Sequence, residues 1–370
     1  MKYLWAILST LILECICDTT KMLVCTHRHG VRNPGVRLPY MPIWFDPSMQ
    51  SELTQVGMRQ EYLLGVYMRL KYSSFIPESF NPNQIYIRST NTNRTIQSAY
   101  CHSYGLFTYS YKMTDHQIIA SRPPVVSNLS FIENQLESNV TYNNFIPSII
   151  HTILMAYDTL LASDWGLCKY FVTLQKMVYQ TSEWKNLNNK FKIEYLPIIS
   201  EIFDFNQSLV DEKDYIDLLD YIICGYYNGY IDLDLEILER FQNMYSDLFS
   251  MEIVGPQSMN YTMAKLSATN LLNDIVEKFD RKIHDSSYEM LYVEYSFHDS
   301  SIMHILHSLD LVKGSPYIKF ASNVIFELRT DNSVRVAYNG DELLNLPFEN
   351  FKKKVESSIY TQKEWKKLCE

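Results

Sequence analysis

The chain carries the stretch Arg28-His29-Gly30-Val31-Arg32-Asn33-Pro34 directly after an apolar run, Met22-Leu23-Val24-Cys25. The apolar run predicts a buried strand. Gly30 leaves the backbone bare and Pro34 prevents an immediate helix, so we expect the strand to end in a turn. An imidazole between two guanidiniums suits an anionic ligand such as phosphate, which the planar fork of arginine matches bidentately. Taken alone, the stretch is equally compatible with a basic surface turn that contains a bystander histidine.

Two further β-rich runs end in residues of the same kind. Residues 85–87 lead into Arg88-Ser89-Thr90, and residues 290–296 lead into Phe297-His298-Asp299-Ser300. A helical pattern follows each run, and in open α/β sheets the carboxyl ends of the strands form the ligand crevice. The sequence therefore predicts that one site gathers three guanidiniums, two imidazoles and one carboxylate: Arg28, Arg32, Arg88, His29, His298 and Asp299.

These motifs together resemble the histidine acid phosphatases, the phosphatase branch of the histidine phosphatase superfamily. The likeness covers R-H-G-x-R-x-P at 28–34, the block 53–60 with its helix, Arg88-Ser89-Thr90 and His298-Asp299, and it continues more weakly from 321 to the end. Residues of about 115–270 resemble the family only loosely. Asn91 and Asn93 stand where the family usually has two acids, so we expect altered hydrogen bonding behind Arg88.

The resemblance implies hydrolysis of phosphate monoesters at acidic pH through a covalent phosphohistidine, without cofactor or metal. His29 would be the nucleophile, and Asp299 would protonate the leaving oxygen and then deprotonate water. The phosphate oxygens would be bound by the remaining side chains of the site: Arg28, Arg32, Arg88 and His298. Attack requires a neutral imidazole, which nearby guanidiniums favour through like-charge repulsion.

The hydrophobic pattern predicts the α/β fold class, with a central, mostly parallel sheet flanked by helices and an inserted, mainly helical cap. Strands are expected at 323–329 and 333–338, joined as a hairpin, and helices are expected from Thr54 and over 149–161 and 233–249. The predicted domains are a catalytic α/β domain, 18–115 and 271–370, and a helical cap, 116–270.

The amino-terminal 17 residues have the layout of a secretory signal peptide: Lys2, a short apolar run and fairly small residues before Asp18. The chain has seven cysteines, and removal of Cys15 and Cys17 would leave five. By resemblance, Cys168 and Cys369 form a disulfide that joins the cap to the carboxyl end. Glycosylation sequons occur at Asn93, Asn128, Asn139, Asn206 and Asn260. We therefore expect a glycoprotein of the secretory pathway, either secreted or lysosomal/vacuolar.

Composition limits the partners. Asp plus Glu (42) exceeds Lys plus Arg (33), giving a formal charge of −9, and no polybasic stripe is present. This argues against nucleic acid and an anionic membrane surface as partners. No stretch after the amino-terminal run is apolar enough to span a bilayer, so we expect no membrane anchor. The expected partner is a small phosphate monoester or a phosphoprotein, and a homodimer stays open. Alternative functions are a phytase or another specialised histidine phosphatase, or an inactive secreted binding protein on the same fold.

Three other groups of residues have simpler structural interpretations. His304 and His307 could form a metal site with His298, but they lack a matching carboxylate. Asp232 and Asp234 fit a charged helix start better than a calcium loop, since the glycine and final glutamate of such a loop are missing. His27 stands where the family often has an apolar residue, and we interpret it as a local packing variant.

Overall fold

The computed structural model describes residues 19–107, 148–162, 167–259 and 261–370. These residues contain one seven-stranded sheet of order β3-β2-β4-β1-β5-β6-β7. The strands are β1 (Thr20–Arg28), β2 (Ile85–Thr90), β3 (Ile150–Ile153), β4 (Tyr292–Phe297), β5 (Asn323–Arg329), β6 (Ser333–Tyr338) and β7 (Asp341–Pro347). The pairings from β3 to β1 are parallel and those from β1 to β7 are antiparallel. The sheet is thus mixed, with β5 and β7 opposed to the other strands.

The sequence located most of these strands because their apolar runs are bounded by turn residues. The predicted strands at 323–329 and 333–338 are confirmed as β5 and β6. The helix predicted over 149–161 is wrong, because this segment contains β3 and a short 3-10 helix, Met155–Tyr157. A short apolar run does not distinguish a strand from a helix by periodicity alone, and here pairing with β2 decides for the strand.

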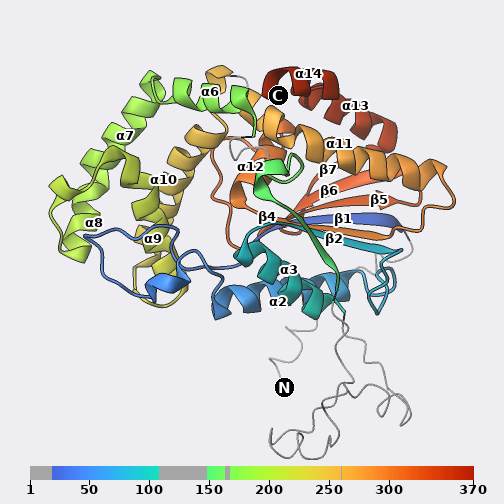
Figure 1. Ribbon diagram of the computed structural model, residues 1–370, viewed down its shortest axis with the longest axis horizontal. Coiled ribbons are helices and arrows are strands. Elements are labelled where there is room, and N and C mark those ends of the chain that lie inside the picture. Colours follow the sequence, from blue (N-terminus) through green and yellow to red (C-terminus); the bar gives the residue numbers. More distant parts are fainter. Residues whose placement is uncertain (1–18, 108–147, 163–166, 260) are drawn as a thin grey trace, which may run out of the picture.

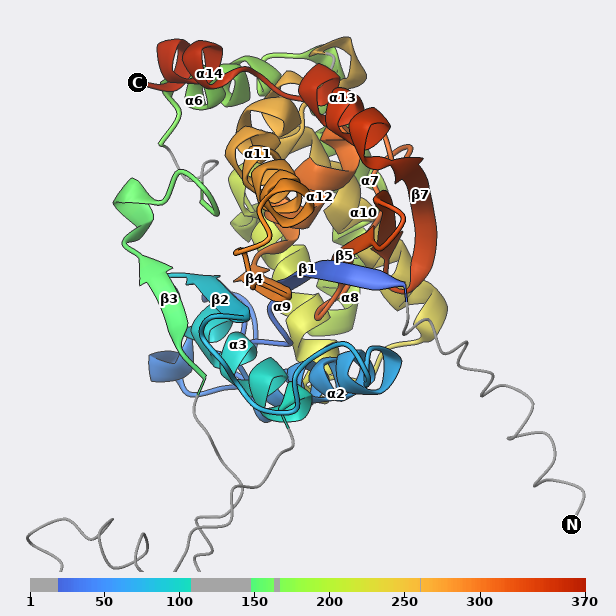
Figure 2. The same ribbon diagram turned by 90° about the vertical axis from the view of Figure 1, so that its right-hand side faces the viewer.

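Helices cover both faces of the sheet (Figures 1 and 2). On one face lie α2 (Gln55–Lys71) and α3 (Asn93–Leu106), and on the other lie α11 (Thr262–His284), α12 (Asp299–Ser308) and α13 (Phe348–Ser358). Side chains of β1 alternate between them: Leu23 and Cys25 pack with α2 and α3, whereas Met22 and Val24 pack with α11 and α12. Thr54 caps α2, as the sequence predicts.

A helical lobe stands beside the carboxyl end of the sheet and is the green and yellow part of Figure 1. Its helices are α6 (Lys169–Val178), α7 (Ser182–Glu194), α8 (Leu196–Phe203), α9 (Tyr215–Tyr227) and α10 (Leu235–Ile253). Its core also takes in Val31, Leu38 and Met41 from the segment after β1. Within the predicted cap, 116–270, β3 belongs to the sheet and α11 packs on it. The lobe therefore occupies the middle of that range.

The last helix, α14 (Gln362–Cys369), is tied to the start of α6 by a disulfide between Cys168 and Cys369, which closes 201 residues of chain. This is the pairing that the resemblance implied. The signal peptide predicted at 1–17 and the sequons at Asn128, Asn139 and Asn260 lie outside the described residues. Among the helices that the structure describes, none is both long and apolar enough to cross a membrane.

A buried group of charged side chains joins four elements beneath the carboxyl end of the sheet. His27 of β1 contacts Glu61 of α2 at 3.0 Å and Glu294 of β4 at 3.2 Å, and Glu294 also contacts His102 of α3 at 2.8 Å. All four side chains are completely buried. His27 is therefore more than a packing variant, because it links α2 and α3 to the two central strands through ion pairs.

The pKa values of this group are shifted in opposite directions. Burial alone lowers the pKa of His27, but the carboxylates of Glu61 and Glu294 outweigh burial and raise it to about 10. Burial alone raises the pKa of Glu294, but His102 and His27 lower it to about 2. The His27 contribution to stability is therefore complete below its unfolded pKa of about 6.5 and is lost as the pH rises through about 10. The Glu294 contribution is complete above its unfolded pKa of about 4.5 and is lost as the pH falls through about 2.

We predict that His27→Phe lowers the free energy of unfolding by about 3–5 kcal/mol, because it leaves two buried carboxylates without their partner. The loss should be largest at about pH 5.5 and smaller at about pH 9, where His27 is neutral in the unfolded chain and folding must take up a proton. Urea unfolding at both pH values measures it.

The matched control is Lys213→Gln, which breaks the exposed pair of Lys213 with Asp211. Removal of such a pair should change stability by less than about 1 kcal/mol at either pH. Equal losses in the two variants would contradict a structural role for the buried group.

Candidate active site

The register of two adjacent parallel strands places two histidines side by side. Arg28, the last residue of β1, pairs with Phe297, the last residue of β4. His29 and His298 follow immediately, and the His29 amide donates to the Phe297 carbonyl at 3.0 Å. Their rings lie edge to face with centroids 5.6 Å apart. The two histidines therefore lie together at the carboxyl edge of the sheet, as the sequence predicts.

The turn after His29 is held against the start of α2 by close backbone contact. A Cβ atom on Gly30 would lie 2.3 Å from the Gly57 carbonyl oxygen, and one on Gly57 would lie 2.1 Å from the Val31 carbonyl oxygen. Both positions therefore require glycine. The Val31 amide also donates to Gln60 Oε1, and the Gly30 amide donates to Ser98 Oγ on α3. These contacts fix the turn that carries His29.

His29 is kept neutral by its surroundings. Burial lowers its pKa well below the usual value, and Arg94, Arg28, His298 and Arg32 lower it further. Its Nδ1 lies 2.8 Å from the Gly30 carbonyl oxygen, which can only accept, so Nδ1 carries the proton. The lone pair of the neutral ring is then on Nε2, as a nucleophilic imidazole requires.

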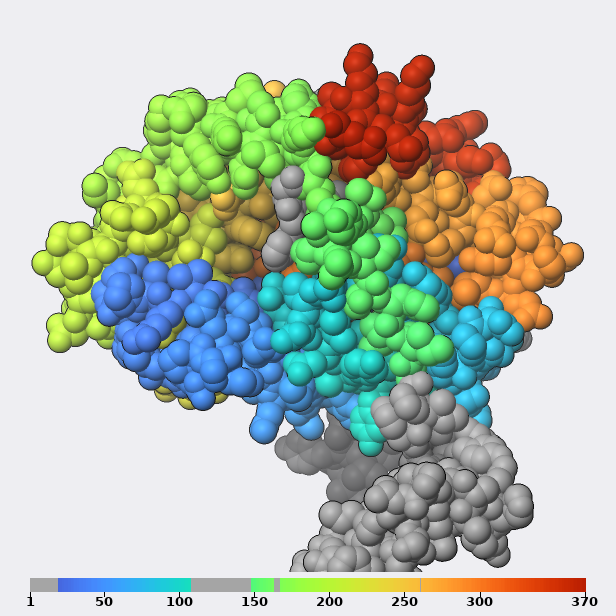
Figure 3. Space-filling model, viewed as in Figure 1, coloured from blue at the N-terminus to red at the C-terminus, as the bar shows by residue number. Residues whose placement is uncertain are grey.

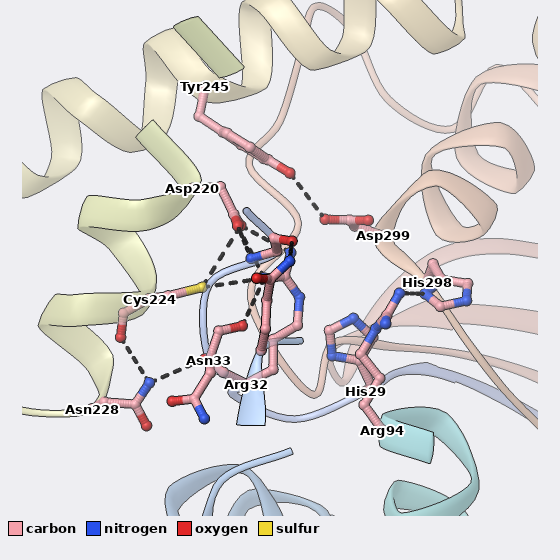
Figure 4. A network of polar contacts seen from close by, with 12 residues as sticks. His29, Arg32, Asn33, Arg94, Asp220, Cys224, Asn228, Tyr245, His298 and Asp299 are labelled. Carbon is pink, nitrogen blue, oxygen red and sulfur yellow. Dashed lines mark hydrogen bonds and ion pairs between the residues drawn. The ribbon is translucent and has the colours of Figure 1, made fainter. Parts of the chain in front are cut away.

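Asp299 is the first residue of α12 and is bound from two sides. Its Oδ2 accepts from Arg28 Nη2 at 2.8 Å, and its Oδ1 accepts from the Ser300 amide at 3.0 Å. Arg28 is itself almost fully buried, with its guanidinium 4.0 Å from the centre of the Phe320 ring. The Tyr245 hydroxyl donates to Asp299 at 3.5 Å (Figure 4). The carboxyl group is thus held in one orientation beside the two histidines.

Arg32 forms a bidentate pair with a carboxylate that the sequence did not point to. Its Nη1 and Nη2 each donate to Asp220 of α9 at 2.9 Å, and Nη1 also contacts the Cys224 sulfur at 3.5 Å (Figure 4). Burial alone raises the pKa of Asp220, but Arg32 outweighs burial and lowers it. Asp220 comes from the helical lobe, so the lobe itself positions a guanidinium of the site.

Arg94 lines the pocket where Arg88 is expected from the sequence. Arg88 points from β2 toward Asp158, with which it forms a buried ion pair, and it does not line the pocket. Arg94 lies in the first turn of α3, and its Nη2 is 3.4 Å from His298 Nδ1. His298 Nε2 is 3.1 Å from Thr90 Oγ1. Strand β2 continues for two residues beyond Arg88, so Arg88 lies short of the edge of the sheet. Helix α3 begins after this edge, and Arg94 in its first turn lines the pocket.

These side chains line a pocket of about 380 Å³ between the sheet edge and the lobe. Of the six predicted residues, His29, Arg32, His298 and Asp299 line it, Arg28 touches it through Asp299, and Arg88 lies outside. In Figure 3 the surface is hollowed between the blue segment after β1 and the helices of the lobe. Arg32 and Arg94, which line the pocket, each have a buried Nε atom without a hydrogen-bond partner among the described residues. Buried donors of this kind suit an anionic ligand.

One group among the described residues has the spacing of metal ligands, namely His27, His102 and Glu294, with ligating atoms within 4.8 Å of one another. These atoms hydrogen-bond one another and do not line the pocket. His304 and His307 bond backbone carbonyls instead, those of Ile253 for His304 and of Met303 and Gly314 for His307. Asp234 caps α10, in agreement with a charged helix start.

Comparison with known proteins agrees with this geometry. Residues 39–339 match the model of the histidine phosphatase superfamily, branch 2. The lysosomal acid phosphatase of Xenopus laevis is 26% identical over 322 residues, which cover 85% of this chain and 67% of that protein. The prostatic acid phosphatase of Mus musculus is 25% identical over 345 residues, covering 89% of this chain and 80% of that protein.

Among solved structures, the apo form of Hafnia alvei phytase matches with a TM-score of 0.62 at 14% identity, over 92% of this chain and 97% of that one. This likeness concerns the fold. The family model spans well over half of the chain, and the curated relatives are named acid phosphatases. The chain therefore belongs to branch 2 of the histidine phosphatase superfamily and is a phosphatase enzyme.

Proposed function

We propose that this protein hydrolyses phosphate monoesters at acidic pH through a phosphohistidine formed on His29. The observation that carries the proposal is the neutral, buried His29 imidazole, whose Nδ1 is tied to the Gly30 carbonyl while guanidiniums surround the ring. A nucleophile of this kind stays deprotonated in acid, because its pKa lies well below the usual value. His29 can therefore act as a nucleophile at the acidic pH that we propose for the reaction.

In the first step, Nε2 of His29 attacks phosphorus, a nitrogen–phosphorus bond forms and the bond from phosphorus to the ester oxygen breaks. The protonated carboxyl of Asp299 gives its proton to the departing oxygen. In the second step, the Asp299 carboxylate takes a proton from water as the water oxygen attacks phosphorus. The nitrogen–phosphorus bond breaks, phosphate leaves, and both His29 and Asp299 return to their starting states.

Asp299 must carry a proton before the first step, and a carboxylic acid in that role favours acidic pH. The contact with Arg28 then serves to orient the carboxyl group. This requirement gives a physical reason for an acidic optimum.

The transferred phosphoryl group would be bound by Arg94, Arg32 and His298, which line the pocket, with Arg28 close by on Asp299. Such preorganised donors stabilise charge that develops on the oxygens in the transition state. The proposed set replaces Arg88 by Arg94, since Arg88 is held by Asp158 outside the pocket.

The rival function of an inactive binding protein would not require His29, His298 and Asp299 to face one pocket, as they do. We also propose passage through the secretory pathway, which the Cys168–Cys369 disulfide supports because disulfides persist in oxidising compartments. Small phosphate monoesters are the proposed substrates.

We predict that the purified protein hydrolyses both 4-nitrophenyl phosphate and alkyl phosphates at about pH 5 in the presence of a chelator. Asp299→Ala should reduce turnover of alkyl phosphates about 10²–10⁴-fold, because a departing alkoxide needs a proton. The loss should be much smaller for 4-nitrophenyl phosphate, whose leaving group needs little protonation. Steady-state kinetics on both substrates measures the contrast.

The control is Ser300→Ala, which retains the Asp299 carboxyl and the backbone amide that orients it. It should affect both substrates equally. Equal losses on both substrates in Asp299→Ala would show that this residue is not the general acid, and inhibition by the chelator that a divalent ion reverses would contradict metal-free hydrolysis.

We predict that Arg94 supports catalysis, whereas Arg88 supports the stability of the fold. Arg94→Ala should reduce kcat/KM about 10²–10³-fold, as loss of one transition-state donor does, while the protein stays folded. Arg88→Ala should mainly lower the free energy of unfolding, by about 3–5 kcal/mol, because it leaves Asp158 buried without its partner. Kinetics and urea unfolding of both variants measure the two effects.

Arg94→Lys provides a matched variant that keeps the charge but loses the planar fork, so its kcat/KM should lie between those of the native protein and Arg94→Ala. A folded Arg88→Ala variant with the larger loss of kcat/KM would restore Arg88 as the phosphate ligand.

A further inference from the structure

A second cavity, in the helical lobe, adjoins the pocket that holds His29. The second cavity, of about 540 Å³, lies between α7, α9 and α10. Ile216, Asp217 and Glu252 line both spaces, so they form the junction between them. An ester whose phosphate lies at His29 would place its alcohol portion toward this junction.

The charged residues differ between the two adjoining spaces. At the phosphate end the guanidiniums of Arg32 and Arg94 stand with the carboxylates of Asp220 and Asp299, two charges of each sign. At the junction stand two half-buried carboxylates, those of Asp217 and Glu252. Among the described residues that line the second cavity, Lys213 is the basic one, and it is exposed and lies 3.4 Å from Asp211. The walls away from the phosphate end are therefore acidic.

Aromatic rings stand beside these carboxylates. Tyr179 and Trp184 line the second cavity with ring centroids 5.1 Å apart, and the Tyr179 hydroxyl donates to Glu252. Tyr215 lines the same space. Aromatic faces next to carboxylates bind cations, and quaternary ammonium groups in particular, because the ring face is negative and the methyl groups need an apolar contact.

We propose that this protein prefers small phosphate monoesters whose alcohol portion carries a positive charge, such as aminoalkyl or trimethylammonioalkyl phosphates, with the cation bound at Asp217, Glu252 and Trp184. The proposal rests on the proposed phosphatase function and adds the substrate class. Esters that carry several phosphates should be poor substrates, because their further phosphates would face the acidic walls.

The preference should depend on pH through the junction carboxylates. Burial raises the pKa of Asp217 to about 6, the carboxylates of Asp220, Asp214 and Glu252 add to the rise, and Arg32 opposes it. Burial also raises the pKa of Glu252, opposed by the hydrogen bond from Tyr179. Both groups become anionic as the pH rises, so selectivity for a cation should increase through about pH 6.

The test compares phosphocholine with 3,3-dimethylbutyl phosphate, in which a carbon replaces the charged nitrogen and the shape is retained. Homologues of both esters with longer alkyl chains are also tested, because the chain must reach from the phosphate end to the junction. For the best spacer, kcat/KM at about pH 7 should be about 5–20-fold higher for the cationic ester, and the ratio should be smaller at about pH 5. In Asp217→Asn the ratio should fall about 3–10-fold.

Asp232→Asn removes the same charge from an exposed position outside both cavities and should leave the ratio unchanged. Trp184→Leu should lower the ratio more for trimethylammonium than for primary ammonium esters. Equal kcat/KM for each pair of isosteres, or a ratio that Asp217→Asn does not change, would overturn the inference while the phosphatase function stands. Absence of turnover with every ester, 4-nitrophenyl phosphate included, would overturn both.

Discussion

The parallel pairing of β1 with β4 is the constraint on which the site depends. Because the two strands end in register, at Arg28 and Phe297, the residues that follow them reach the same edge of the sheet together. A shift of one residue would turn one of the two histidines to the other face of the sheet. The buried contacts of His27 with Glu294 join the same two strands just beneath this edge. Strand pairing and the buried ion pair therefore both hold β1 and β4 in the register that brings His29 and His298 together.

The positive charges around His29 are partly neutralised by carboxylates. Two of the nearby guanidiniums are bound to carboxylates in the free protein, Arg32 to Asp220 and Arg28 to Asp299. These pairs hold the cations in place near the ring, while burial and the remaining positive field keep His29 neutral. Because Asp220 belongs to α9, the position of the helical lobe and the geometry of the phosphate end are linked. The lobe thus contributes both to the phosphate site and to the walls beyond it.

Much of this arrangement could be predicted from the sequence, since β1, β5 and β6 are apolar runs bounded by turn residues and the motifs lie at strand ends. The error at 149–161 arose because a short apolar segment has no decisive period. The sequence predicts Arg88 at the site because it ends a short β-rich run, but β2 continues to Thr90 and the side chain of Arg88 points to Asp158. Asp220 and Glu294 could not be found from sequence, because their partners are far away along the chain.

The most direct test of the account is to identify the residue that carries phosphate during turnover. The protein is mixed with 4-nitrophenyl phosphate, quenched in alkali, where phosphohistidine survives, and digested for mass spectrometry of the peptide that contains His29. The account predicts phosphate on His29 in the native protein, and neither phosphoenzyme nor turnover in His29→Ala. Phosphate on another residue, or sustained turnover by a folded His29→Ala variant, would contradict it.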